Sequence, residues 1–136
     1  MSVEKKTEFH VVNHSVPRRD GRVKVTGKAM YVSDVKLTGM AYAKVLRSPY
    51  PHAKIVSIDT ARAESQAGVY CVLTGDRLDG LNPYYGHAVK DHPLLAIEKV
   101  RYIGEPVAAV VAESERAAFC ALEHIEVKYE ELKPVL

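Results

Sequence analysis

The sequence predicts one domain of the mixed α/β class (α+β), with small mixed sheets and two short helices. Three observations predict it. Runs of β-forming residues recur along the chain, two segments between them carry helix caps, and the whole has only 136 residues. That length suits one hydrophobic core. With 47% hydrophobic and 26% charged residues, the composition excludes disordered and collagen-like chains.

The first two expected strands lie on either side of a proline-containing loop. Residues 41–47 nearly alternate between apolar and polar side chains, which predicts a strand, and residues 54–58 predict the next. Between them, Pro49 and Pro51 fix φ and disfavour helix at the residues before them. Residues 48–52 are therefore expected to form a loop.

A short helix and a third strand are expected next. Asp59 or Thr60 can cap a helix from residue 61 to about residue 66, and Gly68 is placed to end it. Residues 69–74 are apolar and β-forming throughout, which predicts a strand covered on both faces. Residues 75–93 form the longest expected loop, and such loops often bind ligands or partners.

The last third of the chain predicts strands around one helix. A turn at residues 104–106 separates two β-forming runs, and residues 125–130 alternate strictly, as in a strand with one solvated face. Ser114 can cap a helix whose apolar residues recur at the i, i+3, i+4, i+7 spacing. Each helix thus joins two strands, and each such unit is expected to form a right-handed crossover.

The charge is uneven although the formal net charge is only +2, too small to imply a polyanionic partner. Residues 1–28 carry seven basic and three acidic side chains, whereas residues 98–131 carry eight acidic and four basic ones. Residues 1–17 lack periodicity and are expected to form a flexible arm, either solvated, which we favour, or lying on acidic surface. Nucleic-acid binding is not expected, because no aromatic-bearing strand accompanies the basic residues.

Neither a membrane span nor a secretory signal is expected. No apolar run approaches the roughly 20 residues of a membrane helix, and the charged start is not followed by an apolar stretch. Cys71 and Cys120 lie in apolar stretches, which predicts two buried thiols in a reducing compartment rather than a disulfide. We therefore expect a cytoplasmic protein.

No active site can be assembled from the residues alone. His10 and His14 could share a helix face as zinc ligands but lack a nearby third ligand. His87 and His92 flank Asp91 and could approach a cation, although hydrogen-bonding roles are favoured. The sequence contains no G-x-S-x-G, Walker A or G-x-G-x-x-G motif.

Several ordered segments nevertheless resemble a known family. They are RRDGRVKVTGKAMYVSD (18–34), RSPYPHAKI (47–55), DHPLLA (91–96), VRYIGEPVA (100–108) and VKYEEL (127–132). In order and spacing they resemble the opening of the large, molybdopterin-binding subunit of the xanthine dehydrogenase/aldehyde oxidase family. The resemblance implies an N-terminal α/β-hammerhead domain over residues 18–136.

Members of that family are molybdenum hydroxylases, in which water supplies oxygen to an aldehyde or N-heterocycle carbon. Electrons pass from molybdenum through [2Fe-2S] clusters to FAD or another acceptor. The family's molybdopterin-binding segments and glutamate base belong to later domains, so the resemblance implies no catalytic, cofactor-binding or metal-ligating residue in this chain. A structural or assembly role in such an oxidoreductase is expected, with a free-standing adaptor module of the same fold as the alternative.

Four residues are predicted to make interdomain contacts. Arg18, Arg19 and Arg22 could pair with acidic surface of neighbouring domains, and His52 could help to hold the loop at 48–52. The expected partners are the molybdopterin-binding domains and the iron–sulfur and FAD subunits or domains.

Overall fold

The computed structural model describes residues 10–12, 14–78 and 80–134. They belong to two compact units, Met1–Leu37 and Thr38–Leu136, which we describe separately. The sequence instead predicts a domain boundary between residues 17 and 18. Residues 1–9 and 13 of the expected arm lie outside the described residues, and the arm stays a prediction.

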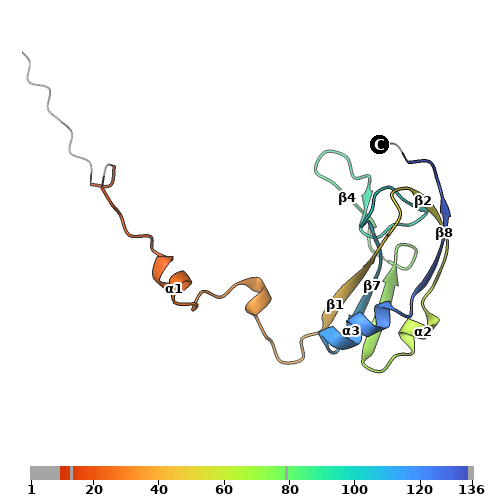
Figure 1. Ribbon diagram of the computed structural model, residues 1–136, viewed down its shortest axis with the longest axis horizontal. Helices are drawn as coiled ribbons and strands as arrows, with labels where there is room; N and C mark the ends of the chain where they lie inside the picture. Colours follow the sequence, from red (N-terminus) through yellow and green to blue (C-terminus); the bar gives the residue numbers. More distant parts are fainter. Residues whose placement is uncertain (1–9, 13, 79, 135–136) are drawn as a thin grey trace, which may run out of the picture. The chain divides into compact units, whose positions relative to one another are not determined.

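The first unit contains helix α1 (Gly21–Val25) and a 3-10 helix, η1 (Val32–Asp34), both visible in Figure 1. Asp20 accepts ion-paired hydrogen bonds from Lys24 and from Arg18, each at 2.6 Å. These two cations lower the pKa of the Asp20 carboxyl. Neither helix buries a residue, and solvent screens exposed ion pairs such as these so that they add little to stability. The contacts that stabilise α1 therefore come from its own segment of the chain.

The second unit is built on two three-stranded sheets in which all strand pairings are antiparallel. The first sheet has the order β1-β7-β3, with β1 (Tyr42–Arg47), β7 (Pro106–Ala112) and β3 (Val69–Thr74). The extra residue Tyr70 makes a β-bulge in β3, between Val69 and Cys71. This sheet supplies five buried apolar side chains: Val72, Val107, Ala108, Val110 and Ala112.

The second sheet has the order β6-β2-β8, with β6 (Lys99–Val100), β2 (Ala53–Asp59) and β8 (Glu126–Glu131). Val56 is the extra residue of a β-bulge in β2. A small hairpin, β4 (Tyr84–Tyr85) with β5 (His92–Pro93), interrupts the long loop expected at 75–93. The strands on either side of the turn at 104–106 belong to different sheets.

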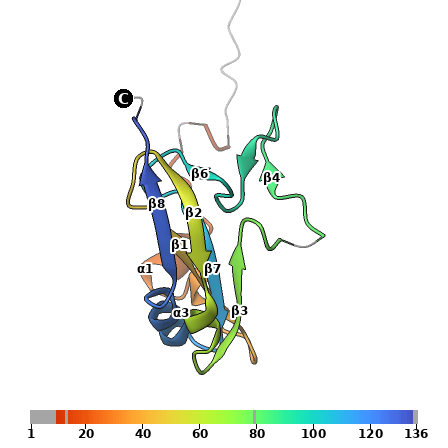
Figure 2. The ribbon, with the colours of Figure 1, turned by 90° about the vertical axis from the view of Figure 1, so that its right-hand side faces the viewer.

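The two helices of this unit carry the chain between the sheets (Figure 2). Helix α2 (Ala61–Glu64) follows β2 of the second sheet and leads to β3 of the first. Helix α3 (Glu115–Leu122) makes the return from β7 to β8. The expected right-handed crossovers are wrong, because crossovers join parallel strands of one sheet and here every pairing is antiparallel. The sheets are correspondingly antiparallel rather than mixed, and α1 is a third helix.

Small apolar side chains fill the core of the second unit. Ala118 and Ala121 of α3 pack with Ala63 of α2 and with Val72 and Val110 of the first sheet. A second cluster joins Ala53, Ala96, Val100 and Val107. Ile58 and Val127 pack against both clusters. The alanines let the helix approach the sheet closely, and Ile58 and Val127 make the two clusters one continuous interior.

The helix starts and ends follow the predicted capping residues. The Ser114 side chain accepts a hydrogen bond from the backbone N–H of Ala117 at 3.1 Å, and Asp59 accepts one from the N–H of Ala61 at 3.0 Å. Gly68 ends the segment after α2 with φ +80°. A Cβ at this glycine would lie 2.6 Å from Glu113 Oε1, so only glycine fits without rearrangement.

Two expectations about coverage are wrong. Strand β3 is not covered on both faces, since Tyr70 is 64% exposed and Cys71 is exposed. Cys120 is also exposed, so the two thiols are not buried. The physical reasons are that α2 and α3 pack on the side of the first sheet that carries Val72 and not on the side of Cys71, and that Cys120 lies off the α3 face formed by Ala118 and Ala121.

A buried carboxylate fixes the turn at which the chain passes from β6 to β7. Glu105 is only 1% exposed. Its Oε1 accepts a hydrogen bond from Arg101 Nη1 at 2.8 Å, and its Oε2 accepts one from the backbone N–H of Arg101. The Glu105 carbonyl accepts from the N–H of Ser48 at 2.9 Å, and the Ser48 carbonyl accepts from the N–H of Gly104 at 2.8 Å. The turn is thereby fastened to the loop between β1 and β2.

Among the described residues, no helix has the length and apolar character required to cross a bilayer.

Replacing Ser114 by Ala removes the α3 cap, and we expect the free energy of unfolding to fall by about 1 kcal/mol. Urea denaturation followed by circular dichroism measures this loss. Ser33→Ala, at an exposed serine of η1, is the control and should change it by less than about 0.5 kcal/mol. Equal stability of S114A and the unsubstituted chain would contradict the capping role.

Replacing Glu105 by Ala should lower the free energy of unfolding by about 2–3 kcal/mol, because charged hydrogen bonds are lost and a void is left. Glu105→Gln keeps one acceptor oxygen and should lose about 1 kcal/mol. Glu130→Ala, at an exposed carboxylate of β8, is the matched control. Urea denaturation measures this loss as well. An equal free energy of unfolding for E105A and E130A would contradict the stabilising role of Glu105.

Candidate functional site

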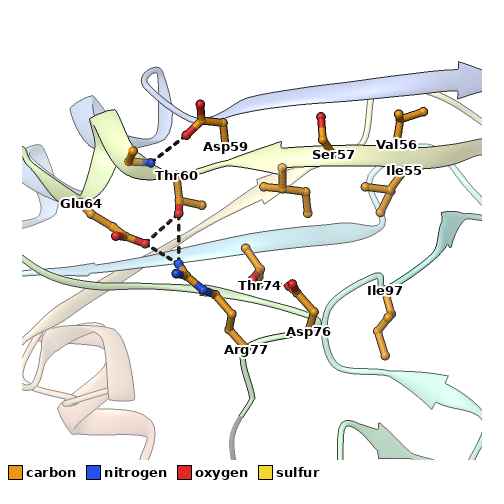
Figure 3. A pocket seen from close by; sticks show the side chains of 12 residues that line it. Ile55, Val56, Ser57, Asp59, Thr60, Glu64, Thr74, Asp76, Arg77 and Ile97 are labelled. Atoms are coloured by element: carbon orange, nitrogen blue, oxygen red, sulfur yellow. Dashed lines mark hydrogen bonds and ion pairs between the residues drawn. The ribbon is translucent and has the colours of Figure 1, made fainter.

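A groove lies between β2 and the turn that follows β3. It has a volume of about 490 Å³. One wall is β2 from Ile55 to Asp59, and another is the start of α2. Thr74, Asp76, Arg77 and Ile97 line the opposite side, as Figure 3 shows.

A network of three side chains holds one end of the groove. Thr60 donates from Oγ1 to Glu64 Oε1 at 2.7 Å, and Arg77 donates from Nη1 to the same oxygen at 2.6 Å. Arg77 Nη1 also lies 3.3 Å from Thr60 Oγ1. The Thr60–Glu64 pair spans one helical turn, whereas Arg77 comes from the turn after β3. The network therefore ties α2 to that turn.

The pKa of Glu64 lies below its ordinary value of 4.5, first because Thr60 donates a hydrogen bond to the carboxylate and second because Arg77 does. A general base works best with a pKa near the working pH. A carboxylate held ionised by two donors is a weak proton acceptor at neutral pH. The network thus resembles a structural clamp or a recognition site for polar groups more than an acid–base pair.

A second, smaller pocket of about 190 Å³ lies beside the hairpin β4–β5. The His92 ring centroid is 4.8 Å from that of Tyr85 and 6.3 Å from that of Tyr102. His92 Nδ1 donates to the carbonyl oxygen of Pro93 at 3.0 Å. These contacts give His92 a packing and hydrogen-bonding role, as favoured from the sequence.

The structure provides no converging set of metal ligands in the part of the chain that it describes. In that part, no three or more His, Cys, Asp or Glu side chains are grouped so that they could hold a metal ion. His10 and His14 therefore gain no third ligand, and Asp91 with His87 and His92 forms no such group.

The four predicted contact residues are separated between the two units. Arg18, Arg19 and Arg22 are exposed in the first unit, where Arg18 is ion-paired with Asp20. His52 belongs to the second unit, and its Nδ1 donates to the carbonyl oxygen of Lys133 at 2.9 Å. His52 thus contacts the backbone that follows β8, and contacts of all four residues with other domains stay predictions.

Sequence reasoning missed the Thr60–Glu64–Arg77 network and the buried position of Glu105. Thr60 and Glu64 are four residues apart in the sequence, and so are Arg101 and Glu105. This spacing is a signal that could have found these two pairs. Nothing in the sequence places Arg77 beside Glu64, because a turn that follows another strand supplies it.

With this geometry established, the chain can be compared with known proteins. Residues 26–133 match the hammerhead domain described as "Aldehyde oxidase and xanthine dehydrogenase, a/b hammerhead domain". The chain belongs to this family. The resemblance found in the sequence and the hammerhead fold are both confirmed.

Named relatives and solved structures agree with the assignment. The hammerhead chain is 50% identical over 116 residues to a probable xanthine dehydrogenase component of Bacillus subtilis (strain 168), and the match covers 85% of this chain. Quinoline 2-oxidoreductase from Pseudomonas putida 86 matches with a TM-score of 0.80 and 40% identity over 88% of the chain. CO dehydrogenase from Oligotropha carboxidovorans matches with a TM-score of 0.80 and 41% identity over 86%.

The hammerhead chain spans only a small part of these proteins: 15% of the Bacillus relative, 16% of the quinoline enzyme chain and 15% of the CO dehydrogenase chain. Its own cysteines are too few for the [2Fe-2S] clusters that the family implies. Iron–sulfur clusters of the [2Fe-2S] type are held by four cysteine thiolates, and this sequence has two cysteines.

Substituting Thr60 by Val removes the first donor to Glu64, so the pKa of Glu64 should rise toward 4.5. The lowered pKa means that ionised Glu64 contributes stability above about pH 4.5, and that this contribution is lost as the pH falls through the lowered value. NMR titration of the side-chain carboxyl carbon measures the change. Thr26→Val, in the first unit, is the control, and an unmoved Glu64 pKa in T60V would contradict the assignment.

Proposed function

We propose that this chain is the hammerhead part of a molybdopterin-dependent oxidoreductase of the xanthine dehydrogenase/aldehyde oxidase type. Its role is structural: it forms a wall of the large subunit and takes part in assembly. It does not catalyse the reaction alone. Molybdopterin, [2Fe-2S] clusters and FAD belong to the other parts of the enzyme, which act in the cytoplasm.

The observation that carries this proposal is the extent of the match. The family domain covers residues 26–133 of this chain, while the same stretch makes up only 15% of the Bacillus relative. Most of such a relative therefore lies outside the matched part, with room there for the cofactor-binding segments.

The chemistry of the described residues supports a non-catalytic role. Glu64 is ionised and accepts hydrogen bonds from both Thr60 and Arg77, and the carboxylate of Glu105 is buried against Arg101. Neither arrangement pairs a nucleophile with a base, which acyl- or group-transfer catalysis would require. Both arrangements instead fix backbone segments.

Isolation of the tagged chain from its source cells tests the proposal. We expect it to co-purify with polypeptides that carry the molybdopterin-binding and iron–sulfur sequences. Substrate-dependent dye reduction and molybdenum should appear in the assembled fraction and be absent from the separated chain. Metal analysis by mass spectrometry and a dye-reduction assay provide the two measurements.

Two results would contradict the proposal. Molybdenum or dye reduction in the separated chain would overturn the non-catalytic role. Recovery of the chain with no oxidoreductase polypeptide would instead favour the free-standing adaptor module.

A further inference from the structure

Over six paired residues one face of the first sheet is apolar, with Ala43, Val45 and Cys71 exposed, while Arg47 follows on the same side of β1. The antiparallel registers place two rows of side chains on it, because directly opposed residues point to the same side of a sheet. The rows are Ala43, Val111 and Cys71, then Val45, Ala109 and Leu73. We call these six residues the apolar sheet face.

The other face of the same sheet is covered by α3 and α2. There Ala108, Val110 and Ala112 of β7 are buried with Val72 of β3 against the helix alanines. On the apolar sheet face, by contrast, Val45 is 38% exposed and Cys71 is exposed. Ala109 and Val111 of the central strand are only partly buried. The helices therefore pack on one side of the first sheet, and part of the other side is exposed.

This exposure conflicts with the usual pattern of such sheets. A half-solvated antiparallel sheet alternates apolar residues inside with polar residues outside, and β8 does so with Glu126, Lys128 and Glu130. Strand β3 lacks this alternation, and its continuous apolar run is the reason that its sequence predicts cover on both faces. The composition of β3 and β7 therefore suits a sheet with cover on both sides, of which this chain supplies one.

We propose that the part of the large subunit outside this chain packs its own apolar surface onto the apolar sheet face. This inference rests on the proposed function. The matched part makes up only 15% of the Bacillus relative, so most of a large subunit is available as the occupant. The six side chains carry no charge, and three of them (Ala43, Ala109 and Cys71) are small. They suit a close-packing partner with larger aliphatic or aromatic side chains.

A second copy of this chain is a poorer occupant. Three strands about 4.8 Å apart, with two same-face residues on each, span about 200 Å² of sheet. Stable interfaces bury about 800 Å² on each partner. The face is thus too small to hold a symmetric dimer by itself, whereas within a large subunit it would be one region of a more extensive domain contact.

Substitution of Val45 by Lys tests the proposal in the assembled enzyme. The lysine would have to be buried without a partner, so we expect at least about a tenfold loss of the co-purifying large-subunit polypeptide, equivalent to about 1.4 kcal/mol. Val89→Lys, at an exposed valine of the loop between β4 and β5, is the matched control and should assemble normally. Circular dichroism of the separated variants checks that both fold.

Thiol labelling tests the same surface without any substitution. In the separated chain Cys71 and Cys120 are both exposed and should react with iodoacetamide. In the assembled enzyme the ratio of Cys71 to Cys120 labelling should fall by about tenfold or more, because a covered thiol reacts only after local opening. Peptide mass spectrometry measures both sites.

The outcomes separate this inference from the proposed function. If the wild-type chain assembles while V45K also assembles and Cys71 labels as before, only the inference about the face is overturned. If the wild-type chain joins no large-subunit polypeptide, both fail. A wild-type dimer that V45K abolishes would overturn the proposed occupant in favour of a second copy.

Discussion

Glu105 joins the two sheets at the point where the chain leaves one and enters the other. Its carboxylate binds the backbone and guanidinium of Arg101, and its carbonyl binds Ser48 in the loop between β1 and β2. The Ala96 N–H donates to the carbonyl of Pro106 at 2.7 Å and adds a third segment. Burial of a carboxylate is costly unless its hydrogen bonds are satisfied, and here Arg101 supplies two of them. The turn is therefore one point at which the two sheets are tied together.

The two helices α2 and α3 also connect the sheets. Helix α2 carries the chain from the second sheet to the first, and α3 carries it from the first sheet to the second. Ala118 and Ala121 keep α3 close to the first sheet, and Val127 of β8 reaches both clusters. The result is a pair of small antiparallel sheets that short helices join around one shared interior.

Hydrophobic periodicity and helix-capping residues made several strands and helices predictable from the sequence. The alternation in β1 and β8 and the Ser114 cap placed those elements correctly, because each signal is local. Strand partners were not predictable: a β-forming run does not reveal whether its neighbour is parallel, so the crossovers were wrong. The apolar run of β3 predicts cover on both faces, which is wrong for this chain, because a run of apolar residues does not reveal which face the helices cover. The Glu64–Arg77 contact likewise depends on a turn distant in sequence.

The bulge at Tyr70 has a consequence for how the chain behaves when it is alone. Strand β3 is at the margin of its sheet, where unpaired backbone groups can recruit the strand of another molecule and start fibrillar stacking. The extra residue shifts the pleat between Val69 and Cys71 and leaves a regular stretch of only four residues. That stretch is shorter than the roughly six or seven residues typical of cross-β segments, so the bulge makes β3 a poorer template for polymerisation.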